Sequence, residues 1–318
     1  MKIKHIVTIG GGTGTFVVLS GLKKYPVNLS AVVSMADDGG STGVLRDEYG
    51  VLPPGDIRRA LVALSESSET LRDLFTYRFE DGGLQGHNFG NLFLSTLEKV
   101  TGDFTSAVRE ASTLLSINGE VVPVTLDNVR LHARLVNGKV IKGQTRIDIP
   151  KDLNRAKIES VWLEPQGRIN PSARRVIHSA DLIIIGPGDL YGSVIPNLLV
   201  RGVPEAIKSS KAKKIYIGNT MTKHGETNDF KAEDFLKEIE KYLGEGVLDY
   251  ALFNKKKPQP ALAARYRKEG AHYVDISNLD LKSKKPKILT ADLIDTGKLV
   301  RHSPKKLAET LLALFSQR

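Results

Sequence analysis

Glycines at residues 10–15 carry the strongest chemical signal in this sequence. The run GGGTGT follows an apolar stretch and precedes a helical pattern of apolar residues. Glycines at such a junction let backbone amides approach an anion, and the start of a helix adds partial positive charge. The residues that we expect to bind a phosphate group are Gly10, Gly11, Gly12, Thr13, Gly14 and Thr15. A tight turn without a ligand is the structural alternative.

The spacing of these glycines excludes two common phosphate motifs. It is neither G-x-G-x-x-G nor a P-loop, which would end in Gly-Lys-Ser/Thr. Nicotinamide dehydrogenases and P-loop kinases depend on those spacings. The run therefore favours a different class of nucleotide-binding protein.

Two aspartates follow the second apolar stretch, residues 29–35. They are Asp37 and Asp38 in SMADDGGSTG. In doubly wound sheets the ligand crevice lies where strands end, so either carboxylate could hold Mg²⁺, and one could hydrogen-bond a ribose or base. The alternative is an Asp-rich turn whose side chains bond to their own backbone.

Two further segments place polar residues at predicted helix starts. LPPGDIRRAL at residues 52–61 has Asp56 as the expected cap and Arg58 and Arg59 in the first turn. Cations there are disfavoured by the helix dipole, and an anionic ligand would offset this. In GHNFGNL, residues 86–92, we expect Asn88 and Asn91 to recognise a base or sugar, or to cap the helix.

Two loops after later strands supply the remaining candidates. IIIGPGDLYGSVIPNLL at residues 183–199 repeats the order strand, glycine loop, helix, and offers Gly188, Asp189 and Ser193. The polar loop GNTMTKHGETNDF at residues 218–230 offers Asn219 together with Lys223. We expect both loops to face the same crevice.

Several chemistries are absent from the sequence. There is no cysteine, no G-x-S-x-G elbow and no metal-type histidine spacing, so the catalytic residues stay unassigned. The 46 basic and 36 acidic residues give a net charge of +10, but the basic runs lack interleaved aromatics. This pattern favours a solvated face over a nucleic-acid groove. Apolar runs of strand length, and none near ~20 residues, predict a cytoplasmic protein without membrane insertion.

The elements that position these residues form an α/β pattern. Residues 5–35 read strand, helix, strand, which predicts a parallel sheet. Residues 36–54 are expected to be a long loop that becomes ordered on ligand binding. An antiparallel excursion is predicted at about 120–165 around Asn137-Gly138. Further helices are predicted at 56–64, 69–79, 88–100, 105–115, 172–179, 194–208, 231–243, 259–268 and 304–315, and strands at 181–185, 214–217, 247–253 and 273–276.

Taken together, the six segments in order resemble the YvcK family, the gluconeogenesis factors of the CofD-like superfamily. The resemblance implies one Rossmann-like, doubly wound domain over residues 1–318, with a mainly parallel sheet and a β-hairpin insertion. It also implies a cytosolic bacterial regulator that binds UDP-sugars, notably UDP-N-acetylglucosamine, and is linked to carbon metabolism, cell shape and peptidoglycan synthesis. A regulatory protein partner and a homo-oligomer are both compatible with this.

The related transferase branch, 2-phospho-L-lactate transferase, moves a phospholactyl group from a nucleotide-activated donor and uses Mg²⁺. Its GGTG and ADD elements are similar to residues 11–14 and 36–38 here, whereas GPGDLYGS and PPGDIRRAL are similar to the gluconeogenesis-factor branch. Within that branch, Tyr266 and Arg301 resemble an aromatic and a basic contact to the sugar nucleotide. The leading physical hypothesis places the diphosphate on the amides of residues 10–15, the nucleoside near Asp37 and Asp38, and the sugar facing the loops at 186–193 and 218–224.

Overall fold

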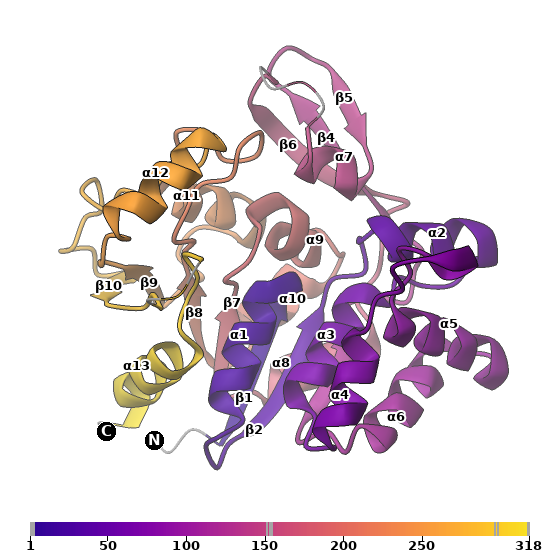
Figure 1. The fold of residues 1–318 in the computed structure, drawn as a ribbon. Helices are drawn as coiled ribbons and strands as arrows, with labels where there is room; N and C mark the ends of the chain where they lie inside the picture. The colour runs from indigo at the N-terminus through magenta and orange to yellow at the C-terminus, as the bar shows by residue number, and fades with distance from the viewer. Residues whose placement is uncertain (1–3, 151, 153–154, 296, 298, 317–318) are drawn as a thin grey trace.

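A seven-stranded parallel sheet forms the centre of the computed structural model (Figure 1). The structure describes residues 4–150, 152, 155–295, 297 and 299–316. The strand order is β10-β9-β8-β7-β1-β2-β3, and all neighbouring strands in this sheet pair in parallel. The predicted doubly wound α/β fold is confirmed. The strands are β1 (His5–Gly10), β2 (Asn28–Val33), β3 (Glu120–Pro123), β7 (Leu182–Ile185), β8 (Lys213–Ile217), β9 (Tyr250–Asn254) and β10 (Lys287–Ala291).

Helices cover both faces of this sheet, because its central strands are apolar on both sides. On one face α1 (Gly12–Leu22) packs between α3 (Gly55–Leu64) and α13 (Pro304–Ser316). The other face holds α8 (Pro171–Ser179), α9 (Ile195–Leu198), α10 (Val203–Ser209) and α11 (Ala232–Leu243). The outer helices are α4 (Glu69–Thr76), α5 (Phe89–Thr101), α6 (Phe104–Leu114) and α12 (Pro260–Lys268).

A second, small sheet stands apart from the main one in Figure 1. It is antiparallel, with the order β5-β4-β6, and its strands are β4 (Arg130–Leu135), β5 (Val140–Lys142) and β6 (Ile158–Glu164). The Asn137-Gly138 hairpin is therefore confirmed. The expected excursion began too early, because β3 pairs in parallel with β2 and is the edge of the main sheet. A short helix that the sequence did not indicate, α7 (Gln144–Asp148), follows β5.

Two other expectations about the elements are wrong. Residues 36–54 are not a long loop, because α2 (Gly40–Tyr49) occupies most of them. Its buried Arg46 donates from Nη1 to the carbonyl of Asp37 and from Nη2 to that of Val129, both at 2.7 Å. Residues 273–276 make only an isolated bridge between Tyr273 and Met221, and the last strand is instead β10.

Candidate functional site

A cavity of about 580 Å³ lies where the sheet changes direction, between the carboxyl ends of β1 and β7. The chain runs outward from β1 to β2 and β3, then returns to β7 on the other side of β1. Loops after such neighbouring strands separate and leave a crevice, which is where open α/β sheets bind ligands. The volume lies in the range of small-molecule sites. The structure thus brings the glycine run and the later loops to one place.

The glycine run turns directly into α1, which begins at Gly12 rather than after the run. Gly12 has φ +63°, a backbone conformation that L side chains rarely adopt. A Cβ on Gly14 would overlap the backbone carbonyl of Pro187, so this glycine lets α1 approach the loop after β7. The amides of Thr13 and Gly14 belong to the first turn and have no acceptor within the helix. They line the cavity and are free to face an anion.

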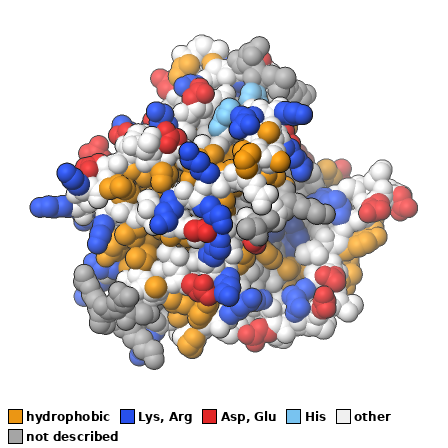
Figure 2. All heavy atoms as spheres, turned by 60° about the vertical axis from the view of Figure 1, so that its left-hand side comes forward, with side chains coloured by type: hydrophobic (Ala, Val, Ile, Leu, Met, Phe, Trp, Pro, Cys, Tyr) orange, Lys and Arg blue, Asp and Glu red, His pale blue; other side chains and the backbone are white. Residues whose placement is uncertain are grey.

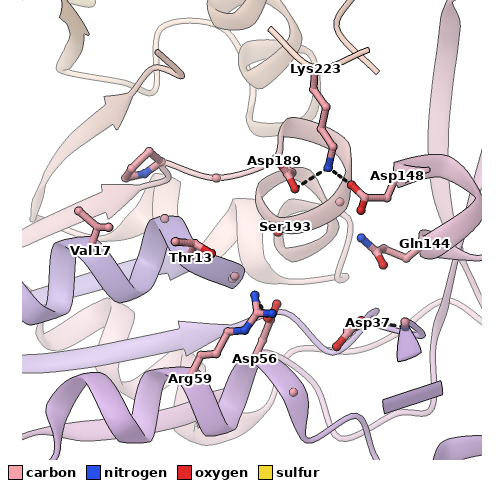
Figure 3. Close-up of a pocket in the computed structure, with 18 of the residues that line it drawn as sticks. Thr13, Val17, Asp37, Asp56, Arg59, Gln144, Asp148, Asp189, Ser193 and Lys223 are labelled. Carbon is pink, nitrogen blue, oxygen red and sulfur yellow. Dashed lines mark hydrogen bonds and ion pairs between the residues drawn. The ribbon is translucent and has the colours of Figure 1, made fainter. Parts of the chain in front are cut away.

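Asp56 closes one side of this turn. It lies in the first turn of α3 and does not cap the helix as expected, because its carboxyl bonds to the amide of Gly12 and lies against Gly11. Burial, and then the charge of Asp37, raise the pKa of Asp56 to about 7. Arg59, with its side chain 45% exposed, lies 3.9 Å from Asp56, and Figure 3 shows both beside the start of α1. We call residues 11–14, Asp56 and Arg59 the glycine wall.

The two aspartates after β2 point to different places. Burial raises the pKa of Asp37, which lines the cavity and accepts from the amide of Gly39 at 3.0 Å. Asp38 accepts from the amides of Gln144 and Thr145 (3.0 and 2.8 Å) and from the hydroxyl of Thr145. Its carboxylate is therefore used to hold the start of α7. The expectation of Asp38 as a cavity-facing magnesium or nucleoside ligand does not fit this geometry.

The two asparagines of residues 86–92 bond to other protein groups, one of which is a neighbouring arginine. Asn88 caps α5, accepting from the amide of Asn91 at 3.2 Å, and it donates to the carbonyl of Tyr77. Asn91 lines the cavity, but its Oδ1 accepts from Nε of Arg58 at 2.9 Å. These amides are thus occupied by protein groups and act on a ligand only through the residues that they orient.

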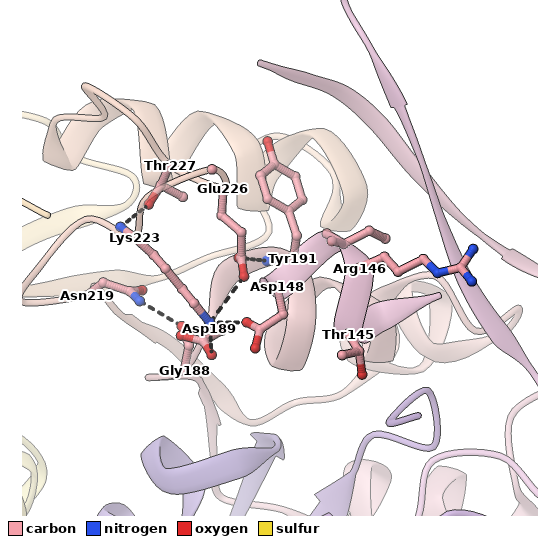
Figure 4. Close-up of polar contacts among 12 residues, drawn as sticks. Thr145, Arg146, Asp148, Gly188, Asp189, Tyr191, Asn219, Lys223, Glu226 and Thr227 are labelled. Carbon is pink, nitrogen blue, oxygen red and sulfur yellow. Dashed lines mark hydrogen bonds and ion pairs between the residues drawn. The ribbon is translucent and has the colours of Figure 1, made fainter. Parts of the chain in front are cut away.

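Opposite the glycine wall, a lysine joins three acidic side chains from separate segments (Figure 4). Lys223 Nζ bonds to Asp148, and it lies 2.8 Å from Asp189 Oδ2 and 3.4 Å from Glu226 Oε1. Burial raises the pKa of Glu226, whose side chain is fully buried, well above its usual range, while the charge of Lys223 acts in the opposite direction. We call these four residues the lysine wall. Each charged group in it already has a protein partner.

The remaining predicted residues divide into two groups. Asn219 lines the cavity with Nδ2 bonded to the carbonyl of Gly188 at 2.7 Å, and Gly188, Asp189, Ser193 and Arg301 line it too. Five predicted residues do not line the cavity as the structure describes it: Gly10, Thr15, Asp38, Asn88 and Tyr266. Gly10 ends β1, Thr15 is buried in α1, and the hydroxyl of Tyr266 accepts from the amide of Val300 at 3.2 Å.

Sequence reasoning missed the contribution of the small sheet to the cavity. Gln144, Thr145 and Asp148 of α7 line it, although they lie more than a hundred residues from the glycine run. A five-residue helix without a clear apolar period gives almost no sequence signal. Gly143, which has φ +98° just before α7, is the sequence signal that could have indicated a change in chain direction here.

Comparison with known proteins agrees with this architecture. The family described as 2-phospho-L-lactate transferase CofD matches residues 6–294. A gluconeogenesis factor from Halalkalibacterium halodurans is 41% identical over 98% of this chain and 97% of its own length, and one from Bacillus subtilis is 40% identical over 98% of both. A crystal structure of a UPF0052-family protein from Bacillus halodurans superposes with a TM-score of 0.93 at 40% identity, covering 98% of this chain and all of that one.

Fold and site define a doubly wound α/β protein with a glycine turn beside a cavity at its switch point. The chain belongs to the CofD family, and its relatives carry the name gluconeogenesis factor. Figure 2 shows basic side chains interspersed with acidic and apolar ones, not a continuous basic stripe, on the face it presents. Among the described residues, no helix has the length and apolar character needed to cross a bilayer.

Proposed function

We propose that this protein is a cytoplasmic regulator that binds a UDP-sugar, with UDP-N-acetylglucosamine as the leading ligand. The observation that carries the proposal is the turn at residues 11–14. Its first-turn amides face a cavity of about 580 Å³, which Arg59 also lines. Backbone amides and a guanidinium together are suited to a diphosphate. The names of the relatives support a role in carbon metabolism, and cell-shape control is part of the same proposal.

The direct test is a titration of the full chain with UDP-N-acetylglucosamine, measured by calorimetry, with UDP-glucose, ADP-glucose and NAD as comparisons. We expect saturable binding of UDP-sugars and weaker binding of the others. Arg59→Gln should weaken binding about tenfold, because it removes a charge-assisted contact. Arg109→Gln is the matched control, since this arginine is exposed on α6. Equal binding of all four compounds, or equal loss in both variants, contradicts the proposal.

A transferase is the second candidate, and two buried carboxyls favour it. Asp37 and Asp56 both line the cavity, burial raises the pKa of each carboxyl, and the charge of Asp37 raises the pKa of Asp56 further. A pair of buried carboxylates without enough counter-charge fits Mg²⁺, which would neutralise the pair and the phosphates of a nucleotide-activated donor. Asp37 and Asp56 would hold the ion, and Arg59 would orient the diphosphate.

The pH dependence separates the two candidates. Metal binding needs both carboxyls ionised, so Mg²⁺ affinity should rise as the pH increases through about 7, the pKa of Asp56. Binding of a sugar nucleotide without metal should instead weaken over the same range, because an ionised Asp56 repels the diphosphate. Release of nucleotide from UDP-N-acetylglucosamine or a GTP-derived donor with Mg²⁺ supports an enzyme. Saturable binding without release supports a regulator.

A further inference from the structure

Three arginines gather at the cavity, and one of them, Arg59, belongs to the glycine wall. Arg58 and Arg59 are consecutive in α3, and Arg78 follows α4. All three line the cavity. Consecutive helix residues point about 100° apart, so Arg58 and Arg59 address different parts of the space. Arg59 faces Gly12, since a Cβ added to Gly12 would lie 3.7 Å from Nη1 of Arg59. Arg58 must therefore point toward a different part of the cavity wall.

Arg58 is buried, with 7% of its surface exposed, and protein hydrogen bonds fix the orientation of its side chain. Its Nε donates to Asn91 Oδ1 at 2.9 Å, and its Nη1 donates to the carbonyl of Phe75 at 3.1 Å. Gly90 makes room for it, since a Cβ there would lie 2.7 Å from Arg58 Cδ. Nη2 has no partner among the described residues and is not one of the enclosed unpartnered atoms. A buried arginine that lines the cavity therefore keeps one donor nitrogen without a partner among the described residues.

The charges around Arg58 leave a positive excess. Burial, followed by the charges of Arg59 and Arg78, lowers the pKa of Arg58 to about 10. Asp56 and Asp37 act in the opposite direction, but the pKa of each is itself raised by burial, which weakens them as permanent counter-charges. Like charges gathered in this way are costly unless an anion joins them.

We propose that Arg58 and Arg78 form a second oxyanion subsite, separate from the diphosphate site, for a carboxylate or phosphate monoester. The group could be carried by the sugar of the bound nucleotide or by a separate small anion. A guanidinium held in a fixed orientation is suited to such groups because its unpaired Nη2 can donate a charge-assisted hydrogen bond to an oxyanion. The proposal rests on the proposed function insofar as the glycine wall holds the diphosphate.

A purely structural role for Arg58 is the competing explanation. Its two protein bonds tie α3 to the end of α4 and to α5, and Arg58→Gln could simply loosen this packing. Arg78 avoids the difficulty, because it is exposed and its Nη1 donates only to the nearby carbonyl of Gly86 at 2.5 Å. A structural role predicts no ligand-dependent effect of Arg78→Gln.

The experiment compares two nucleotides that differ by one carboxylate. Calorimetry on the full chain would use UDP-glucose and UDP-glucuronate with the unsubstituted protein, Arg78→Gln and the control Arg109→Gln. We expect UDP-glucuronate to bind about tenfold more tightly than UDP-glucose, and Arg78→Gln to abolish that advantage while Arg109→Gln keeps it. In the second arm, inorganic phosphate is titrated with UDP-glucose already bound. Binding of phosphate there, lost in Arg78→Gln, identifies a free anion as the occupant.

Equal affinity for the two nucleotides, together with no phosphate binding beside UDP-glucose, overturns the subsite. Should neither nucleotide bind, the proposed function fails, and phosphate alone then decides the subsite. Phosphate binding that Arg78→Gln removes and Gly12→Val leaves intact supports it. Phosphate binding that only Gly12→Val removes, or no phosphate binding at all, refutes it.

Discussion

The glycine wall and the lysine wall face each other across one cavity, but they present different kinds of chemical group. The glycine wall consists mainly of backbone from residues 11–14, with Asp56 and Arg59 added from one helix. The lysine wall consists of charged side chains from α7, the loop after β7 and the loop after β8 (Figures 3 and 4). The amides of Thr13 and Gly14 in the first wall have no partner among the described residues, whereas the charges of the second wall are paired.

This difference indicates a division of labour. Unpartnered donors are ready for a ligand, while a closed cluster of ion pairs joins segments together. Lys223 links the small sheet, through Asp148, to the main sheet, through Asp189 and Glu226. We infer that the first wall binds and the second holds the cavity in shape. Substitutions in the glycine wall should therefore reduce ligand affinity, whereas those in the lysine wall should act mainly on stability.

The largest effect is expected from Gly14→Ala in the glycine wall. The new Cβ would overlap the carbonyl of Pro187, so α1 must move away from the loop after β7. We expect the free energy of unfolding to fall by about 1–3 kcal/mol, as in overpacked sites, and UDP-sugar binding to be lost. Urea denaturation and calorimetry measure the two effects. Gly83→Ala is the control, because nothing lies within 4 Å of its added Cβ. Equal stability of the two variants contradicts the close approach.

In the lysine wall, Lys223→Met should destabilise the protein more than Glu226→Gln. Removing the lysine leaves three acidic groups facing one another, and we expect a loss of about 1–3 kcal/mol, reduced by the partial exposure of Lys223. Burial favours the neutral form of Glu226, so a neutral glutamine of nearly the same shape should cost less than about 1 kcal/mol. Thermal unfolding of both variants at pH 7 compares them. A larger loss in Glu226→Gln reverses the assignment.

The raised pKa of Asp56 predicts how the stability of the folded protein depends on pH. Its pKa in the folded protein is about 7, above that of an exposed aspartate, so its protonated form is favoured on folding. The stability that this provides is complete below about pH 4 and is lost as the pH rises toward 7. Asp56→Asn should remove that decline. Unfolding by urea at pH 4.5, 5.5, 6.5 and 7.5 tests it, and parallel curves for the two proteins would show that the pKa of Asp56 is not raised.

The smallest effect concerns Asp38, which holds the start of α7 from outside the cavity. Asp38→Ala should lower the free energy of unfolding by about 1 kcal/mol, as for a lost helix cap, and should leave Mg²⁺ affinity unchanged. Asp37→Ala should abolish any Mg²⁺ binding. Titration with Mg²⁺ in the presence of UDP-N-acetylglucosamine compares the variants. Loss of Mg²⁺ binding in Asp38→Ala would restore it as a metal ligand.

Much of the main sheet could be predicted because its signals are local. Runs such as residues 5–9 and 181–185 are apolar and β-branched, and turn residues separate them from amphipathic helices. The weak points were short or marginal elements. Residues 36–54 contain so much Gly and Asp that the sequence pattern did not indicate α2. Its buried Arg46 is held partly by Asn128 and Val129, which are distant in the sequence.

The sequence alone determined the parallel α/β class, the glycine turn at the end of β1 and the position of Asp37 beside it, because each depends on neighbours within a few residues. Only the tertiary structure decided that Asp38 turns away to α7, that Asn91 serves Arg58, and that Lys223 gathers Asp148, Asp189 and Glu226. The physical reason is range. Backbone turns are set by local sterics, whereas the partner of a buried charge is whichever group the completed fold brings within a few ångströms.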